Sequence, residues 1–426
     1  MLNREDNALL TRVGPETPMG ALMRQYWIPA IRSARIVPDG KPERVRLLGE
    51  DFVAFRATDG RAGIIDEACP HRRASMALGR NEENGLRCIF HGWKVDVEGK
   101  LVDAPTEPAE RRELFCKHAP QNHYPVREAG GMIWVYLGKK EVPPPFPEFE
   151  FNTLPADHVE PLRGIMKCNW LQALEAALDS AHVGFLHARD GGMRGTKKTF
   201  AETGYMAVNK APRFEFDLQP YGFKEGALRD LPDEEYYARI RQVILPFYSL
   251  IPRLPDEPRL ALISVPIDDF NTIQWYVRYD PDAPLRPEYF ELFGTDCGDP
   301  DYFNADMGDV SNMWHQDREA MKDGHWSGIV GRVNAYEDFV VQESMGPLVD
   351  RSKEYLGASD VIITLARRAL LKAVREHAEN GTVPFMTDSD AVIDYGAIRS
   401  LSIKVPATTK WKELDPFHPP MPQAAE

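Results

Sequence analysis

The sequence predicts an α+β protein in which a small N-terminal all-β domain precedes a larger domain built on an antiparallel sheet flanked by helices. Three observations predict this division. Before residue 140, short runs with strand composition are separated by Gly, Asp and Asn, which favour turns. A run with four prolines in five residues, Pro143–Pro147, then interrupts any sheet and favours an extended linker. Beyond it, strand-like runs alternate with long segments of helical periodicity.

These signals also place the domain boundaries. The expected organisation, in chain order, is a helical segment at 1–43, the β domain at 44–140, the linker at 141–155 and the second domain at 156–426. The clearest helix of the N-terminal segment is predicted near Met19–Trp27. Strands of the β domain are predicted at Arg44–Leu48, Phe52–Arg56, Gly63–Asp66 and Gly131–Gly138.

Two short segments of the β domain each carry one cysteine and one histidine. Cys69 and His71 form a C-x-H motif, and after sixteen intervening residues Cys88 and His91 form a C-x-x-H motif, followed by Gly92-Trp93. A zinc finger usually groups its cysteines in one segment and its histidines in the other. The mixed arrangement instead suits a Rieske-type 2Fe-2S cluster, in which one iron takes both thiolates and the other both imidazoles. A structural zinc site is the alternative.

Composition restricts the class of protein further. The chain has five cysteines, and the three outside the motif, Cys116, Cys168 and Cys297, show no paired spacing, which is typical of a reducing compartment. The N-terminus is acidic without an apolar signal core, and no run has the length of a membrane span, so we expect a soluble cytoplasmic protein. A net charge of −14, from 51 basic and 65 acidic residues, argues against a nucleic-acid partner.

The most informative segment of the second domain is Asn169–His182. Its residues favour a helix, and its polar members recur at steps of three and four on one stripe of an otherwise apolar helix; they are Gln172, Glu175, Asp179 and His182. A buried helix must present such a stripe to polar groups inside the protein. Gly184 is expected to end the helix, and a bend there would let His182 and His187 bind one metal ion. Two satisfied core histidines are the alternative.

The C-x-H, C-x-x-H and D-x-x-H-x4-H motifs together resemble the catalytic subunit of Rieske non-heme iron oxygenases, over the length of the chain. Three later segments are similar to the phthalate-dioxygenase group, namely Asp317–Ile329, Gln342–Ser352 and Leu356–Asp360. The resemblance implies a Rieske 2Fe-2S cluster and a mononuclear Fe(II). It also implies a homotrimer or stacked trimers without a small β subunit, and a separate flavin or ferredoxin-type reductase as electron donor.

A mononuclear Fe(II) of this type is held by two histidines and one carboxylate on one face, which leaves the opposite face to O₂ and substrate. His182 and His187 supply the imidazoles. By similarity, the third ligand is Asp338, the second of two adjacent acids that precede a Gln-Glu pair. Glu337 is the adjacent alternative and Glu343 a more distant one. Neighbouring helix residues point about 100° apart, so only one of Glu337 and Asp338 can face the iron.

Asp179 precedes His182 by one helical turn, which suits a carboxylate that accepts the free N–H of a metal-bound imidazole. The resemblance implies that Asp179 also reaches a cluster histidine, His91, of a neighbouring subunit, so that electrons cross the subunit interface through this side chain. The alternative is that Asp179 only orients His182 or fills a polar position.

The rest of the second domain is expected to enclose the substrate. Strands are predicted at Arg239–Leu245, Arg259–Pro266 and Thr272–Tyr279, and a helix at Val361–Ala378 between Ser359 as N-cap and Asn380-Gly381 as its stop. An aromatic carboxylate needs a cation in an otherwise apolar pocket, ideally arginine. Arg213 and Arg241 are the first candidates, and Arg194, Arg239 and Arg253 lie in the same half; each also suits an ordinary surface or structural role.

Three functions remain open at this point. The favoured one is a terminal oxygenase that inserts both atoms of O₂ into the ring of an aromatic carboxylate, giving a cis-dihydrodiol. The same iron could instead perform monooxygenation, typically O-demethylation of an aryl ether or hydroxylation of a methyl group. The third is a non-catalytic electron carrier, which would need neither the H-x4-H segment nor the long second domain.

Overall fold

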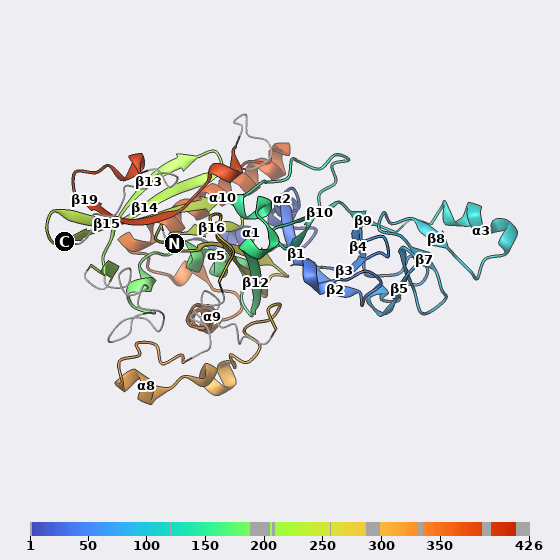
Figure 1. Ribbon diagram of the computed structural model, residues 1–426, viewed down its shortest axis with the longest axis horizontal. Coiled ribbons are helices and arrows are strands. Elements are labelled where there is room, and N and C mark those ends of the chain that lie inside the picture. Colours follow the sequence, from blue (N-terminus) through green and yellow to red (C-terminus); the bar gives the residue numbers. More distant parts are fainter. Residues whose placement is uncertain are drawn as a thin grey trace. The chain divides into compact units, whose positions relative to one another are not determined.

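The computed structural model divides the chain into two compact units, Val13–Pro147 and a larger one formed by Met1–Arg12 together with Glu148–Glu426 (Figure 1). The structure describes residues 2–119, 121–187, 205–206, 209–255, 257–286, 299–330, 335–385 and 393–414. The first residues of the chain therefore belong to the larger unit, whereas the sequence analysis grouped them with all of 1–43. The reason is that α1 (Arg4–Thr11) packs against helices of the larger unit.

The described part of the smaller unit consists of three antiparallel sheets, with strand orders β1-β11-β10, β2-β3-β4-β9 and β5-β6-β7-β8. The strands are β1 (Trp27–Arg32), β2 (Glu43–Leu47), β3 (Glu50–Arg56), β4 (Ala62–Asp66), β5 (Arg80–Glu82), β6 (Gly85–Arg87), β7 (Lys94–Val95), β8 (Leu101–Asp103), β9 (His123–Tyr124), β10 (Val126–Ala129) and β11 (Met132–Tyr136). The predicted strands correspond to β2, β3, β4 and β11. The expectation of an N-terminal β domain is therefore confirmed.

The helix predicted near Met19–Trp27 is shorter than expected. α2 (Pro18–Met23) begins where the Thr17 hydroxyl accepts a hydrogen bond from the Gly20 N–H, with proline at its first position. The chain becomes extended at Trp27 because β1 pairs with β11. Sheet pairing thus overrides the local helix preference. The second described helix of this unit is α3 (Ala109–Cys116).

The larger unit contains one eight-stranded sheet in the order β12-β18-β17-β16-β15-β14-β13, with β19 also paired to β15. All of its pairs are antiparallel, as the sequence predicted. The strands are β12 (Val159–Met166), β13 (Arg213–Gln219), β14 (Gly222–Leu231), β15 (Glu235–Ile244), β16 (Tyr248–Ile251), β17 (Arg259–Pro266), β18 (Thr272–Tyr279) and β19 (Leu401–Pro406). β17 and β18 have the predicted bounds, and β15 begins earlier than predicted.

Helices flank this sheet. Besides α1, those described are α4 (Glu150–Thr153), α5 (Trp170–Leu178), α8 (Arg318–Lys322), α9 (Ala335–Ser344) and α10 (Val361–Asn380). α5 packs against β16, β17 and β18, and α9 packs against α5 and β12. α10 begins at the predicted residue, with Asp360 rather than Ser359 as its N-cap. It ends at Gly381, whose φ of 77° is the left-handed conformation that glycine adopts most easily.

α5 is shorter than predicted, because the chain leaves the helix at Asp179 rather than at Gly184. Asp179 has extended backbone angles, and its Oδ1 accepts hydrogen bonds from two following backbone N–H groups, at 2.6 and 3.4 Å. A carboxylate that binds nearby backbone groups in this way competes with helical hydrogen bonds. His182 consequently lies on a separate 3-10 turn, His182–Gly184, and not on a helical stripe with Glu175.

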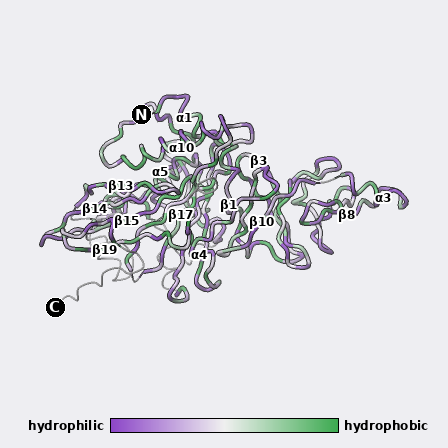
Figure 2. The backbone as a smooth tube through the Cα atoms, turned by 90° about the horizontal axis from the view of Figure 1, so that it is seen from above, coloured by the Kyte–Doolittle hydropathy of each residue, from purple (hydrophilic) through white to green (hydrophobic). Residues whose placement is uncertain are grey.

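Hydropathy varies over short distances along the chain, and hydrophilic residues recur throughout the traced backbone (Figure 2). Within the described residues, no helix combines the length and the apolar character needed to cross a membrane.

Candidate metal centres and substrate pocket

Two loops of the smaller unit carry the four predicted cluster residues. Cys69 and His71 lie between β4 and β5, and Cys88 and His91 lie between β6 and β7. Both cysteines are buried and form no disulfide, whereas both histidines are half-buried. The centroids of the two imidazole rings are 4.5 Å apart. The structure therefore brings both pairs of predicted ligands to one place near the surface of this unit.

The Gly92-Trp93 pair supports this arrangement. Gly92 has a φ of 75°, and its N–H donates to the Cys88 carbonyl at 2.9 Å, which closes the second loop. An added Cβ at Gly92 would lie only 2.9 Å from Pro105 Cγ, so the position suits glycine for space as well as for backbone angle. The Trp93 ring stacks on the His71 ring at 4.4 Å between centroids. It thereby limits rotation of a predicted ligand.

The polar atoms of these four residues fit a metal cluster. His91 Nδ1 is buried and has no hydrogen-bond partner among the residues that the structure describes, an expensive arrangement unless another group binds that nitrogen. Burial raises the pKa of the Cys69 thiol to about 11, and the neighbouring Cys88 thiol contributes to this increase. Two such thiols become thiolates readily only when a cation compensates them. The donor set of two sulfurs and two imidazole nitrogens is that of a Rieske cluster.

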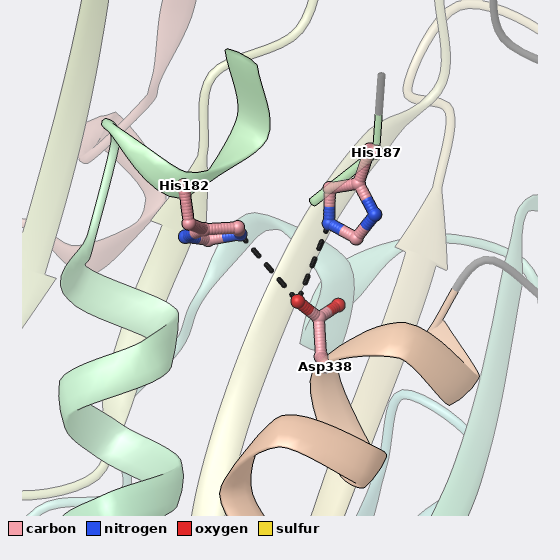
Figure 3. A group of neighbouring side chains, drawn as sticks. All are labelled: His182, His187 and Asp338. Carbon is pink, nitrogen blue, oxygen red and sulfur yellow. Dashed lines mark ion pairs between the residues drawn. The ribbon is translucent and has the colours of Figure 1, made fainter. Parts of the chain in front are cut away.

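In the larger unit, the structure brings His182, His187 and Asp338 together (Figure 3). Asp338 Oδ1 lies 3.4 Å from His182 Nε2 and 3.3 Å from His187 Nε2. One ligand atom from each residue lies within 4.8 Å of the others. The histidines follow α5, and Asp338 projects from the first turn of α9 toward both rings. Two imidazoles and one carboxylate form the donor set of a non-heme iron(II) site.

The second nitrogen of each ring also faces a carboxylate. His187 Nδ1 lies 2.7 Å from Glu337 Oε2, and His182 Nδ1 lies 3.4 Å from Asp179 Oδ2. Glu337, 1% exposed, also accepts a hydrogen bond from the Ser327 hydroxyl. Glu337, the adjacent alternative to Asp338, therefore faces Nδ1 of His187, whereas Asp338 faces Nε2. Glu343 accepts hydrogen bonds from the Trp314 indole and a backbone N–H instead.

These close contacts shift the pKa values of the ionisable groups. Burial lowers the pKa of His187, but the carboxylates of Asp338 and Glu337 outweigh it and raise the value to about 10. Burial likewise works to raise the pKa of Asp338 and of Asp179, yet the adjacent histidines hold both pKa values below their ordinary range. The carboxylates therefore stay ionised, which is the form that binds a cation.

A buried ion-pair network holds α5 in place, and its cationic members, which were not predicted, lie far from α5 in the sequence. Glu175 accepts three hydrogen bonds from Arg351, at 2.9 to 3.2 Å, and one from Arg367 at 2.6 Å. The polar stripe predicted that Glu175 faces polar groups, but spacing along one helix contains no information about distant partners. At the start of α5, Asn169 donates to the carbonyls of Thr11 and Asp269.

A cavity of about 150 Å³ opens beside the three clustered residues. His182, His187, Asp338 and Asp179 line it, together with mainly apolar side chains. The apolar part includes Met166, Ala173, Ala177, Val183, Ile251, Leu260 and Leu262. The cationic part consists of Arg239, Arg241 and Arg253. Such a cavity suits a small ligand with an apolar body and an anionic group.

Comparison with known proteins finds a family match for each of the two domains of the chain. Residues 26–125 match the family described as Rieske [2Fe-2S] domain, and residues 135–420 match the family described as LigXa C-terminal domain like. The phthalate 4,5-dioxygenase oxygenase subunit of Pseudomonas putida is 40% identical over 88% of this chain and 86% of that protein. The 3-chlorobenzoate-3,4-dioxygenase oxygenase subunit of Comamonas testosteroni is 36% identical over 96% of each. The chain belongs to the Rieske-type oxygenase subunits.

Two further similarities agree with this family. The 5,5'-dehydrodivanillate O-demethylase oxygenase subunit of a Sphingobium species is 31% identical over 92% of this chain and 89% of that protein. The terminal oxygenase of carbazole 1,9a-dioxygenase from Nocardioides aromaticivorans shares the fold. Its TM-score is 0.55, at 19% identity over 86% of this chain and 99% of that chain. The Rieske-type oxygenase is thus an oxidoreductase with a 2Fe-2S domain.

The candidate substrate arginines of this oxygenase lie in different places. Arg241 is 2% exposed and lines the cavity, and its Nη2 donates to the Ser180 hydroxyl at 3.1 Å. Arg213 does not line the cavity: its side chain is 55% exposed and forms an ion pair with Glu215. Its position on β13 therefore gives no support to a role as substrate clamp. Arg239 and Arg253 line the cavity, and Arg194 lies outside the described residues.

Proposed function

We propose that this chain is the terminal oxygenase component of a multicomponent system and that it hydroxylates an aromatic carboxylate, phthalate-like or a substituted benzoate, by cis-dihydroxylation of the ring. The observation that carries the proposal is one cavity lined by the two histidines and Asp338, by apolar side chains and by three arginines. Relatives named for phthalate and 3-chlorobenzoate support the same class of substrate.

The clustered residues would hold a mononuclear Fe(II) through His182 Nε2, His187 Nε2 and a carboxylate oxygen of Asp338. When bound there, iron supplies the ability to activate O₂ with electrons delivered from the Rieske cluster. The protein's own contribution is orientation. Glu337 accepts the Nδ1–H of His187, and Asp179 faces Nδ1 of His182, so both rings present Nε2 to the same point.

The arginines would orient the substrate. Arg241 lines the cavity, and among the described residues its Nε and Nη1 have no hydrogen-bond partner, so its guanidinium charge can attract a ligand carboxylate. The ring of that ligand would then contact apolar side chains such as Leu260 and Leu262. With the carboxylate fixed at Arg241, one edge of the ring is held toward His182, His187 and Asp338. Such positioning selects which ring carbons react.

We further propose that Asp179 connects the two metal centres of neighbouring copies in a homotrimer. Its side chain is about one quarter exposed (26%) while it faces His182, so a second group can approach it. In the proposed assembly, that group is His91 of the partner subunit, with a separate flavin or ferredoxin-type reductase reducing the cluster. Asp179 would then accept one N–H from each imidazole.

An oxygen-uptake assay with a supplied reductase tests this function. Phthalate isomers, substituted benzoates and phenoxybenzoates are the substrates, and we expect uptake coupled to a diol with two new hydroxyls on the ring. Neutral isosteres such as benzamide should show kcat/KM values lower by at least about a hundredfold, because an amide offers Arg241 no charged acceptor. Formaldehyde release from a methoxylated benzoate without ring hydroxylation would favour the O-demethylase alternative. Cluster reduction without any oxygen uptake would favour the electron carrier.

A further inference from the structure

A buried carboxylate that the proposed reaction does not use lies next to the cavity arginines. β14 pairs with β15 so that Glu225 is directly opposite Arg241. Side chains alternate along a strand, so Arg239 projects from the same face as Arg241. Glu225 is 0% exposed. A carboxylate in these surroundings is unfavourable in its ionised form unless other groups compensate its charge.

Glu225 and Arg241 are close but are not joined by a hydrogen bond. Arg241 Nε lies 3.7 Å from Glu225 Oε2. Neither oxygen of Glu225 has a hydrogen-bond partner within the part of the chain that the structure describes. The pair of Glu175 and Arg351 differs, because three hydrogen bonds at 2.9 to 3.2 Å join it. Glu225 therefore supplies a negative charge near Arg241 without occupying the arginine's donors.

Among the described residues, four charged groups act on Glu225. Arg229 belongs to its own strand, Arg239 and Arg241 belong to β15, and Asp179 follows α5. Burial raises the pKa of Glu225, the three arginines lower it and Asp179 raises it, and the result is about 7. Because the negative charge of Asp179 raises the pKa of Glu225, a further negative charge in this region also favours protonation of Glu225.

We propose that Glu225 determines the strength of anion binding in this cavity: it balances the charge of Arg241 in the absence of an anion, and takes up a proton from solvent when a substrate carboxylate binds Arg241. The inference rests on the proposed function, since the anion is the carboxylate of the substrate. Binding places a second negative charge beside Arg241, and two like charges near one cation favour the neutral form of the buried acid. Arg241 thus has one anionic partner in both states.

The proposal predicts the direction of the pH dependence. Ordinary carboxylic acids titrate near pH 4, so benzoate keeps its charge throughout the neutral range. Below about pH 7 Glu225 already holds its proton, and binding requires no uptake. Above that pH, binding must draw a proton from solvent, so Kd rises by at most about tenfold per pH unit. Affinity for the anion therefore falls as pH rises through the pKa of Glu225.

Isothermal titration calorimetry of the wild-type holoenzyme tests the proton uptake directly. Benzoate and phthalate are titrated without reductant or O₂ at about pH 7.5, in buffers that differ in ionisation enthalpy. We expect the apparent enthalpy to change with the buffer by an amount that corresponds to uptake of up to one proton per bound ligand. Benzamide, which has the same ring without the charge, should bind without uptake.

Glu225→Gln supplies the second arm, because it keeps the size of the side chain and removes its titration. At about pH 6 the variant and the wild type should bind benzoate with similar Kd values, since Glu225 is then protonated. At about pH 8 the variant should bind about tenfold more tightly, and without proton uptake. Glu215→Gln on neighbouring β13, outside the cavity lining, is the matched control and should behave as wild type.

Two groups of outcomes would overturn the proposal. Carboxylate binding without proton uptake by the wild type, or uptake that persists in Glu225→Gln, would exclude the role of Glu225 and leave the substrate class unaffected. Failure of both carboxylates to bind would overturn the substrate class and the role of Glu225 together. If Glu225→Gln does not fold, as judged by the visible absorption of its cluster, the wild-type titration alone decides between these outcomes.

Discussion

Glu337 and Asp338 are neighbours in the chain, yet they face different nitrogens of the same imidazole. Asp338 Oδ1 is 3.3 Å from Nε2 of His187, and Glu337 Oε2 is 2.7 Å from its Nδ1. The Ser327 hydroxyl donates to the other oxygen of Glu337 and fixes that carboxylate. A carboxylate on the far nitrogen of a metal-bound imidazole sets its tautomer and increases its basicity. We therefore propose direct ligation by Asp338 and orientation of His187 by Glu337.

Substitution of each acid distinguishes these roles. Asp338→Ala should abolish both iron binding and turnover, because it removes a ligand atom. Glu337→Gln should retain iron with an affinity lower by about 10- to 100-fold, the usual effect of losing a carboxylate that hydrogen-bonds a metal-ligating histidine. Iron per chain is measured after dialysis against graded chelator, and the visible absorption of the Rieske cluster reports on correct folding. Exposed Glu319→Gln is the control. Retention of iron by Asp338→Ala with loss from Glu337→Gln would reverse the assignment.

At the scale of elements, α5 is fixed at three points before the chain reaches the histidines. Its first residues bond to the carbonyls of Leu10, Thr11 and Asp269. Its middle is held by the ion pairs of Glu175, and its end by the hydrogen bonds of the Asp179 side chain. This matters for chemistry because His182 and His187 lie on a short irregular segment that has little regular structure of its own. α5 therefore provides the rigid base of the iron site.

The charge of Glu175 should contribute strongly to stability. Glu175→Gln removes the only carboxylate that hydrogen-bonds the buried Arg351 among the described residues and leaves Arg367 paired with Glu354 alone, so we expect a loss of about 3–5 kcal/mol in the free energy of unfolding. Burial opposes ionisation, but the two arginines hold the pKa of Glu175 below its ordinary value. Its stabilising effect is therefore complete above about pH 4.3 and is lost as pH falls through the lowered pKa. Calorimetric melting between about pH 3 and 7 measures this.

The control for this prediction is Glu413→Gln, which removes a carboxylate whose side chain is 68% exposed in a pair with Lys410. It should change the free energy of unfolding by less than about 1 kcal/mol at any pH. An equal effect of both substitutions, or a melting temperature of Glu175→Gln that still falls in acid as steeply as that of the wild type, would show that the network is not the source of the stability.

The same elements show what sequence alone can predict. β17 and β18 were predicted to the residue because each is a short apolar run bounded by turn-forming residues. α5 was predicted too long, because the end of the helix depends on side-chain hydrogen bonds of Asp179 rather than on helix propensity. Spacing predicted the two histidines, which the structure brings together with Asp338, whereas the choice between Glu337 and Asp338 depends on where the His187 ring lies. The opposition of Glu225 and Arg241 depends on strand register, which no short motif encodes.

At the scale of the whole molecule, the two sets of predicted metal ligands belong to different units of the chain. The cluster residues lie within Val13–Pro147, and the two histidines and Asp338 lie within Glu148–Glu426. Electron transfer from one proposed centre to the other would therefore connect the two compact units. The proposed trimer makes this connection between copies, through Asp179 of one chain and the cluster of the next.

Co-expression of two inactive variants tests the connection between copies. Cys88→Ser removes a cluster thiolate and should bleach the Rieske absorption, while Asp338→Ala should leave the cluster intact and remove the iron. Each variant alone should be inactive. When the two variants assemble at random in equal amounts, about a quarter of all interfaces join an intact cluster to an intact iron site, so about a quarter of wild-type turnover should return. Inactive mixed trimers, verified by differently tagged copies, would indicate electron transfer within one chain. Asp179→Asn on the iron-bearing copy should slow the recovered transfer.

The pairing of Met1–Arg12 with Glu148–Glu426 has a consequence for protein engineering. The catalytic domain is discontinuous, and the Rieske domain is an insertion between its first helix and the rest. A chain truncated to start at Glu148 would lack the Leu10 and Thr11 carbonyls that accept hydrogen bonds from Trp170 and Asn169. Exchange of Rieske domains between relatives should therefore use two junctions, after Arg12 and before Glu148. A chimera made in this way would acquire a new cluster domain and keep the support of its own proposed iron site.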